Sequence, residues 1–229
     1  MTVALIRSAI ERLRVNSEHI VELRALDLPG RYGAGGVAAG WFDDPDMLAR
    51  EAARLDLRGA QVYVTLNPAN PALLARAYNR IIERPKATTS DHDILRRVWL
   101  PLDIDPVRPA GVSADPDELA AARQRALDVA AWLHQQLNDD PAIWAFSGNG
   151  FHLLFRIELS NDDAATQMVK GIIETASDRF SDQVVRVDKT VFNAARIWRL
   201  YGTLNRKGDN VPRLGRVHRR AAILGKGFE

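Results

Sequence analysis

The sequence of 229 residues contains no cysteine. A chain without cysteine forms no disulfide, no cysteine-ligated zinc or iron–sulfur site, and no thiol nucleophile. The sequence also lacks an apolar run long enough to span a membrane. Its first residues carry Arg7, Glu11, Arg12 and Arg14 at helical spacing, where a signal peptide would have an uncharged core. These absences predict a cytoplasmic protein with no membrane partner.

The chain also has little net charge, formally +2 at pH 7. A small net charge excludes a general polycation that binds nucleic acid over its whole surface. The cations are uneven, however, and the C-terminal third contains "RIWRL", "NRKG" and "RLGRVHRR". This clustering favours a local anionic partner, with a solubilising tail as the alternative for the last residues.

Hydrophobic periodicity predicts a mixture of strands and helices along the whole chain. Strands are expected at 60–66, 98–105, 142–146, 151–159 and 184–191, and helices at 1–15, 44–56, 70–83, 113–137, 162–180 and 192–202. A glycine-rich loop is expected at 28–40, in "LPGRYGAGGVAAG". The intermixed order predicts an α/β (α+β) fold class.

Two aspartates stand in the otherwise apolar strand "VWLPLDID". Because side chains alternate across a strand, Asp103 and Asp105 point to the same face. A strand end that meets solvent would explain them, but like charges beside a core are costly unless a cation compensates them. Mg²⁺ prefers such carboxylates, and two ions commonly act together on phosphate. Asp188, in the apolar segment "VVRVDKTV", is the candidate for a further ligand.

The segment "WAFSGNGFHLLF" predicts a hairpin whose turn is Ser147, Gly148, Asn149 and Gly150. Ser147 and His152 flank the turn, and the glycines leave backbone N–H groups open to an anion. A hydroxyl, an imidazole and exposed amides together suit a phosphate. The alternative is an ordinary tight turn beside a structural histidine.

Basic residues follow Asp188 in "NAARIWRLYGTLNRKG". In the helix expected there, Asn193, Arg196 and Leu200 share one face, with Arg199 beside it. Lys207 follows in the loop. Arginine binds phosphate oxygens through two parallel hydrogen bonds and lysine adds a point charge, so this segment is a candidate phosphate clamp. A solvated basic helix face is the alternative.

The order of these motifs resembles the archaeo-eukaryotic primase superfamily. The similarity is greatest to the primase–polymerases of plasmids, phages and CRISPR-associated systems. The shared motifs are "LDID", "SGNGFH", "VRVD" and "RLYGTLNRKG", with Tyr201 where proline is usual, and the upstream segments "YVTLNPANP" and "TTSDHDILRRVWL" also match. The resemblance runs from Trp41 to Lys207.

The resemblance implies an RRM-like catalytic sheet packed with a second α/β module. It implies that Asp103, Asp105 and Asp188 hold two Mg²⁺ or Mn²⁺ ions. The implied nucleotide-binding residues are Ser147, Gly148, Asn149, Gly150, His152, Asn193, Arg196, Arg199 and Lys207. The implied reaction is template-directed nucleotidyl transfer from a dNTP or NTP to a primer 3′-hydroxyl on a single-stranded DNA template. A helicase or other replication or CRISPR component is an implied partner in a longer protein.

We therefore expect residues 1–229 to form one catalytic domain. Residues 1–90 would contribute an N-terminal α/β module, 91–210 the metal- and nucleotide-binding module, and 211–229 a basic tail. Two alternatives remain at this point. A metal-dependent nuclease would use the same carboxylates and histidine, and a non-catalytic RRM-like module would bind nucleic acid through exposed aromatic side chains.

Overall fold

The computed structural model describes residues 2–17, 19–30 and 33–229. The chain divides into two compact units. The first comprises residues 1–98, 159–161 and 194–204, and the second comprises residues 99–158, 162–193 and 205–229. Residues 205–229, which include the expected basic tail, therefore group with the second unit. The predicted mixed α/β fold class is confirmed.

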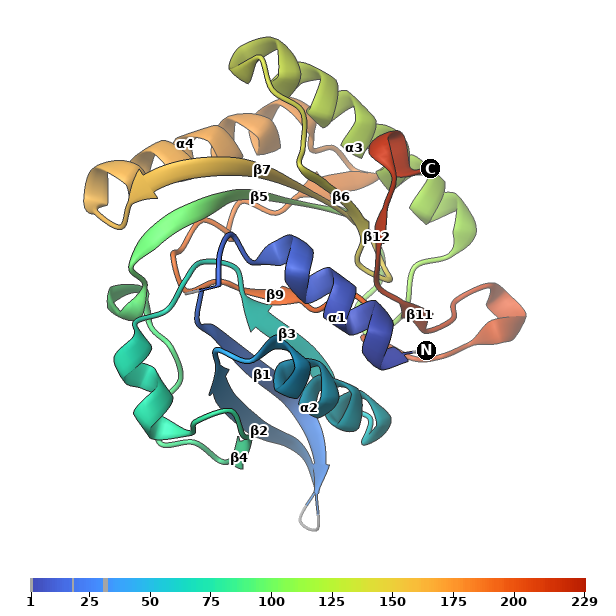
Figure 1. The fold of residues 1–229 in the computed structure, drawn as a ribbon. Coiled ribbons are helices and arrows are strands. Elements are labelled where there is room, and N and C mark those ends of the chain that lie inside the picture. The colour runs from blue at the N-terminus through green and yellow to red at the C-terminus, as the bar shows by residue number, and fades with distance from the viewer. Residues whose placement is uncertain (1, 18, 31–32) are drawn as a thin grey trace. The chain divides into compact units, whose positions relative to one another are not determined.

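The first unit is an antiparallel sheet with two helices packed on it (Figure 1). Its helices are α1 (Thr2–Leu13) and α2 (Pro45–Leu57), and its strands are β1 (Val21–Gly30), β2 (Gly33–Phe42), β3 (Gln61–Thr65), β4 (Ile82–Glu83) and β9 (Ile197–Arg199), with short 3₁₀ helices η1 (Pro71–Arg76) and η2 (Asp91–Asp93). The sheet order is β4-β2-β1-β3-β9.

Local sequence explains both helices of this unit, which occur where they were predicted. In α1 the buried residues Ile6, Ala9, Ile10 and Leu13 recur at helical spacing. Helix α2 begins after Asp44, whose carboxylate accepts hydrogen bonds from the amides of residues 46 and 47, and a proline occupies its first turn.

Two predictions for the first unit are wrong. The segment 28–40, expected to be a loop, belongs mostly to the β1–β2 hairpin, although Arg31 and Tyr32 lie outside the described residues. The helix expected at 70–83 is only the short η1, followed by Asn79 in a left-handed conformation and then β4. Tertiary contacts override propensity here, because the Asn79 Oδ1 atom accepts hydrogen bonds from the amides of Asp43 and Asp44.

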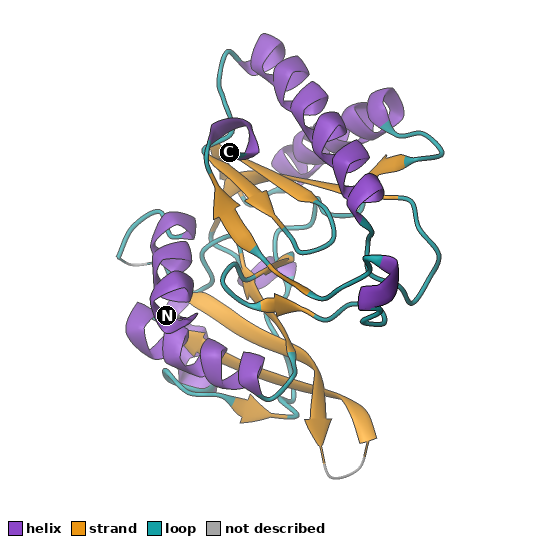
Figure 2. Cartoon of the chain, turned by 90° about the vertical axis from the view of Figure 1, so that its right-hand side faces the viewer, coloured by secondary structure: helices purple, strands orange, loops and turns teal. Residues whose placement is uncertain are grey.

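The second unit has the element order β-α-β-β-α-β of an RRM-like module. These elements are β5 (Arg96–Pro106), which begins in the first unit, then α3 (Pro116–Leu137), β6 (Ile143–Phe146), β7 (Phe151–Ser160), α4 (Asp163–Phe180) and β8 (Val185–Val187). The sheet order is β12-β6-β7-β5-β8, where β12 (Ala222–Leu224) pairs with β6. Figure 2 shows the two longest helices lying together.

The residues after α4 differ from the prediction. The helix expected at 192–202 is wrong, because residues 197–199 form strand β9, which pairs with β3 in the first unit. Ile197 and Trp198 have the side chains that strands favour. Residues 205–229 contribute β12, 3₁₀ helices η3 (Pro212–Leu214) and η4 (Lys226–Phe228), and β11 (Arg219–Arg220), which pairs with β10 (Leu204–Asn205).

Within the described ranges, the structure contains no helix that combines the length and the hydrophobicity needed to cross a bilayer.

Candidate active site

Three carboxylates lie on one face of the second unit's sheet. In the antiparallel pairing of β5 and β8, Ile104 is opposite Val187 and Asp105 is opposite Arg186. One step further along, the Asp188 amide donates a hydrogen bond to the Asp103 carbonyl over 2.8 Å. Asp103 and Asp188 are therefore cross-strand neighbours, and Asp105 shares their face because it is two residues from Asp103.

The opposite face of these strands is apolar. Leu102, Ile104 and Val187 are fully buried. Helices α3 and α4 both pack against β8, and the Ser177 hydroxyl of α4 donates to the Val187 carbonyl. The period-two alternation thus anchors the strands to the helices on one side and presents the carboxylates on the other.

His152 stands next to Asp103. Its Nε2 atom lies 3.4 Å from Asp103 Oδ1, at ion-pair distance but without the alignment of a hydrogen bond. His152 is almost completely buried, whereas 22% of the Asp103 side chain is exposed. Strand β7 therefore brings an imidazole to the edge of the acidic face.

Gly150 allows β7 to approach Asp105. A Cβ atom at this position would lie 2.1 Å from Asp105 Oδ1 and 2.5 Å from the Ile104 carbonyl oxygen. No side chain fits in this space, so the site requires glycine at position 150 for close packing of two strands.

Ser147 closes the predicted hairpin turn. Its hydroxyl donates to the Gly150 carbonyl and accepts hydrogen bonds from the amides of Asn149 and Gly150. Gly148 has the positive φ, +100°, that two-residue hairpin loops need. The turn is as predicted, but two of the amides expected to bind an anion are occupied by the Ser147 oxygen. In the cross-strand register Ser147 and His152 share a face diagonally, because Ala145 is opposite His152.

Two buried asparagines fix the loop that carries Lys207. Asn149 accepts a hydrogen bond from the Ala114 amide and donates to the Lys207 carbonyl. Asn205 donates to the Ser147 carbonyl and accepts from the Lys207 amide. The structure therefore gives the Asn149 side chain a positioning role, and it brings the hairpin and Lys207 together.

A cavity of about 350 Å³ opens beside Asp105. Its charged lining residues are Asp105, Arg108, Arg186 and Lys207. Lys207 was predicted from the sequence, whereas Arg108 and Arg186 were not. Arg186 of β8 lies two residues before Asp188, which directly follows the strand, and this spacing was a usable signal, since residues two apart in an extended segment share a face. Three cations around one carboxylate make the cavity suited to phosphate groups.

The acidic face meets one requirement of a divalent cation site. Asp103 Oδ1 is buried and has no hydrogen-bond donor among the described residues, so an oxygen is left for a cation. Asp188 Oδ1, by contrast, accepts two hydrogen bonds of 2.8 Å from Thr190. In the part of the chain that the structure describes, no three His, Asp or Glu side chains already surround a common metal position. The unpaired Asp103 oxygen suits a cation ligand, whereas Asp105 and Asp188 as further ligands stay predictions.

The remaining predicted site residues, Asn193, Arg196 and Arg199, do not all belong to the same unit. Asn193 belongs to the second unit, whereas Arg196 and Arg199 belong to the first. Arg199 is buried, donates to the Tyr63 hydroxyl over 2.8 Å and stacks on the Tyr63 ring. The helical face on which Asn193 and Arg196 were placed does not exist, and the structure assigns Arg199 a packing contact.

The carboxylates of Asp103 and Asp105 differ in acidity. Burial, together with the charge of Asp103, raises the pKa of Asp105 to about 7. The pKa of Asp103 lies below its ordinary value. Burial alone would raise it, but the nearby His152, Lys207 and Arg108 lower it by more. The pair therefore favours one negative charge over two near pH 6.

We expect a stability change with pH that depends on Asp105. Between its ordinary pKa of 3.8 and about 7, folded Asp105 keeps a proton that the unfolded chain has lost. This contribution to the free energy of unfolding is present at low pH and disappears as pH rises through about 7. Melting temperatures with chelator should show Asp105→Asn gaining on the wild type as pH rises from mildly acidic to mildly alkaline. A constant difference between the two proteins would contradict this assignment.

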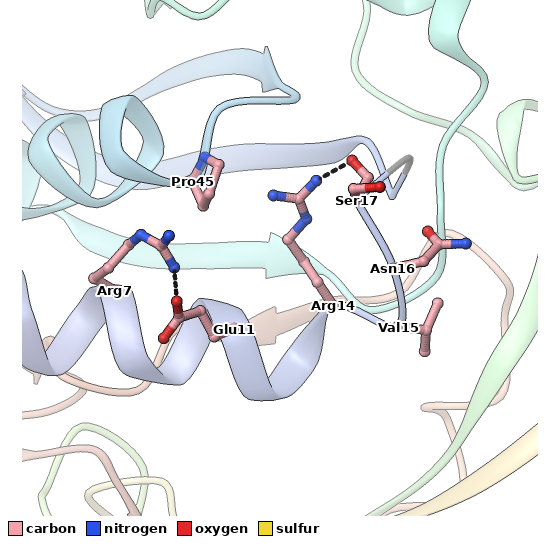
Figure 3. A pocket seen from close by; sticks show the side chains of 7 residues that line it. All are labelled: Arg7, Glu11, Arg14, Val15, Asn16, Ser17 and Pro45. Atoms are coloured by element: carbon pink, nitrogen blue, oxygen red, sulfur yellow. Dashed lines mark hydrogen bonds and ion pairs between the residues drawn. The ribbon is translucent and has the colours of Figure 1, made fainter.

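A second hollow, of about 320 Å³, lies in the first unit between the end of α1 and the start of α2 (Figure 3). Arg7 in its wall forms ion pairs with Glu11 and Asp46. Arg14 donates to the Ser17 carbonyl over 2.6 Å. Both guanidinium groups are bonded to the chain itself, and we assign no ligand to this hollow.

No protein-family model matches the sequence, and no curated protein matches it. Among solved structures, the crystal structure of primase RepB′ aligns with a TM-score of 0.54 and 12% identity, over 100% of this chain and 58% of that chain. The catalytic domain of primase RepB′ in complex with initiator DNA aligns with a TM-score of 0.49 and 12% identity, over 98% of this chain and 87% of that one. The chain thus spans little more than half of the longer RepB′ chain. Its fold is similar to that of primase RepB′.

Proposed function

We propose that the protein is a primase-type nucleotidyltransferase that adds nucleotides to a 3′-hydroxyl on a DNA template. The observation that carries the proposal is the acidic face of an RRM-like sheet, Asp103 and Asp105 with Asp188 opposite, beside a cavity lined by three cations. The similarity of the fold to primase RepB′ supports it. The motif order in the sequence supports the same superfamily, in its plasmid, phage or CRISPR-associated branch.

The acidic part of the site would bind metal ions, and the basic part would bind the triphosphate. Asp103 and Asp105, with Asp188, would hold Mg²⁺ or Mn²⁺. When bound, two such ions neutralise charge on the transferred phosphoryl group and promote loss of the proton from the 3′-hydroxyl. Lys207, Arg108 and Arg186 would bind the triphosphate in the adjoining cavity. The 3′-oxygen would bond to the α-phosphorus as pyrophosphate departs.

His152 would donate a hydrogen bond to the triphosphate from beside Asp103. Its side chain is 4% exposed, and its Nε2 atom lies 3.4 Å from Asp103 Oδ1. The Ser147 hydroxyl would also donate to the triphosphate. A phosphate oxygen would then take the place of the Ser147 oxygen as the acceptor for the amides of Asn149 and Gly150. The positive charges also offset the repulsion between the carboxylates, because Arg108 and Lys207 both lower the pKa of Asp105.

A primer-extension assay with both dNTPs and NTPs, in Mg²⁺ or Mn²⁺ and with a chelator control, tests the proposal. Extension that the chelator abolishes is the expected result. Shortening of the primer would indicate a metal-dependent nuclease instead, and an unchanged primer that binds the protein would indicate a non-catalytic nucleic-acid-binding module.

We expect His152→Ala to weaken nucleotide use without weakening DNA binding. A hydrogen bond to a charged group contributes roughly 1.5–3 kcal/mol, which corresponds to about a 10- to 100-fold loss of kcat/KM for the nucleotide. Steady-state kinetics, DNA affinity and thermal stability should be measured on one preparation. His134→Ala, which removes a half-exposed histidine from α3, is the control. Full kcat/KM in the folded fraction of His152→Ala would remove His152 from the site.

A further inference from the structure

An exposed basic segment runs along one edge of the first unit's sheet. It contains Arg76, Tyr78, Arg80, Arg84 and Lys86, which we call the arginine–tyrosine strip, and all five are exposed. Residues 82 and 83 of this segment form β4, the edge strand that pairs with β2. The single carboxylate within 76–86, Glu83, is neutralised by an ion pair with Arg58.

Tyr78 differs from the other aromatic residues of the chain. Tyr78 is 62% exposed, and among the described residues no other tryptophan, tyrosine or phenylalanine is as open to solvent. Packing does not explain an exposed tyrosine between arginines, because most of its surface lies outside the core. A flat π surface beside cations is the combination that binds unpaired bases and their phosphates.

The backbone holds Tyr78 in this outward position. The residues on either side, Ala77 and Asn79, are buried. The Ala77 carbonyl accepts a hydrogen bond from the Trp41 amide, and the Asn79 amide donates to the Trp41 carbonyl. The Asn79 side chain is fixed in turn by Asp43, to which its Nδ2 atom donates. Tyr78 is thus presented by a segment bonded to β2 on both sides, which limits the entropy lost on binding.

The arginines are held close to the same sheet edge. The Arg76 guanidinium lies 5.5 Å from the centre of the Trp41 ring. The Arg80 carbonyl packs on Gly40, where a Cβ atom would lie 2.1 Å from that oxygen, and the Arg84 amide donates to the Val37 carbonyl. Their backbone is therefore fixed to β2. The Arg80 and Arg84 side chains make no ion pair within the described part of the chain.

We propose that the arginine–tyrosine strip binds single-stranded nucleic acid, with a base stacked on Tyr78 and phosphates on the flanking cations. The proposal deepens the function proposed above, because a single-stranded template is the partner that such an enzyme needs. It rests on different residues from the acidic face. Double-stranded DNA, whose bases are already stacked on one another, would not use Tyr78 in this way.

Fluorescence anisotropy with labelled oligothymidylate, without nucleotide or metal, tests the strip. Loss of one stacked base costs roughly 1–3 kcal/mol, so Tyr78→Ala should bind about 5- to 150-fold more weakly, whereas Tyr78→Phe should bind like the wild type. Arg80→Gln should reduce the slope of log affinity against log salt by about 0.7, the value for one phosphate contact on a single strand. Leu5→Ala and Arg50→Gln, exposed positions on α1 and α2, are the matched controls.

The results separate this inference from the proposed function. Unchanged affinity in Tyr78→Ala, or an unchanged salt slope in Arg80→Gln, would overturn the proposal that the arginine–tyrosine strip binds single strands, even if the protein extends primers. An equal loss of affinity for the matched DNA duplex in Tyr78→Ala would overturn the stacking interpretation. If the wild-type protein extends no primer but Tyr78→Ala binds single strands more weakly, the enzymatic proposal is overturned and the binding role of the arginine–tyrosine strip is supported.

Discussion

Asp103→Asn should abolish nucleotide addition while the protein remains folded. The substitution keeps the shape of the side chain but removes the charge that a cation at the acidic face requires. Metal ions contribute several kcal/mol of charge stabilisation to a phosphoryl transition state, so we expect a rate loss of at least ~10³-fold. Asp105→Asn should behave in the same way. Single-turnover primer extension in Mg²⁺ measures the loss.

Two further measurements distinguish loss of chemistry from loss of structure. Asp105→Asn should melt at a higher temperature than the wild type in chelator at mildly alkaline pH, because it removes the repulsion from Asp103. DNA affinity should be preserved in both variants. Asp178→Asn, at an exposed position of α4, is the control for removal of a carboxylate from the same unit. Near wild-type extension by Asp103→Asn would show that Asp103 binds no catalytic metal.

Gly150→Ala should damage the same site without removing a functional group. The added methyl would meet Asp105 Oδ1 and the Ile104 carbonyl, both well inside van der Waals contact, so β7 and β5 must move apart. Overpacking of this kind costs about 1–3 kcal/mol of stability. A displacement of reacting groups by about 1 Å can cost on the order of 10²-fold in rate, and we expect a loss of kcat/KM of that size.

Gly171→Ala is the matched control for this experiment. Gly171 is in α4 of the same unit, and a Cβ atom there would meet nothing within 4 Å. Alanine should stabilise that helix by up to about 1 kcal/mol and leave activity unchanged. The two alanine variants should therefore shift the melting temperature in opposite directions. Wild-type activity in a stably folded Gly150→Ala would mean that the close approach of Gly150 to Asp105 is not needed for function.

The parts of the site that could be predicted from sequence are those with a local signal. Alternation within "LDID" places Asp103 and Asp105 on one face whatever the rest of the chain does, and "SGNG" between two apolar runs specifies a hairpin. The acidic face of the second unit and its turn were predicted for these reasons. Asp188 was singled out because it interrupts an apolar segment, and the structure places it beside Asp103, while its role as a ligand stays a prediction.

The parts that were missed depend on contacts between distant segments. Arg186 looks like a solvated surface residue until the β5–β8 register places it opposite Asp105. Arg108 follows the end of β5 and lines the same cavity. Asn79 adopts a left-handed conformation in which its side-chain Oδ1 atom accepts hydrogen bonds from the backbone amides of Asp43 and Asp44, more than thirty positions away. The segment 192–202 has helical spacing, yet pairing with β3 makes part of it a strand. Single-sequence periodicity carries no information on such pairings.

The late arrival of β9 has a consequence for the newly synthesised chain. Tyr63 of β3 and its partner Arg199 of β9 are 136 residues apart. At synthesis rates of about 5–20 residues per second, β3 would wait roughly 7–27 s after it is made before its neighbour exists. During that interval the strand presents open backbone groups to other chains. Recombinant yield should therefore fall when translation is slowed, because the interval lengthens, and β3 is the segment at which nascent chains would associate.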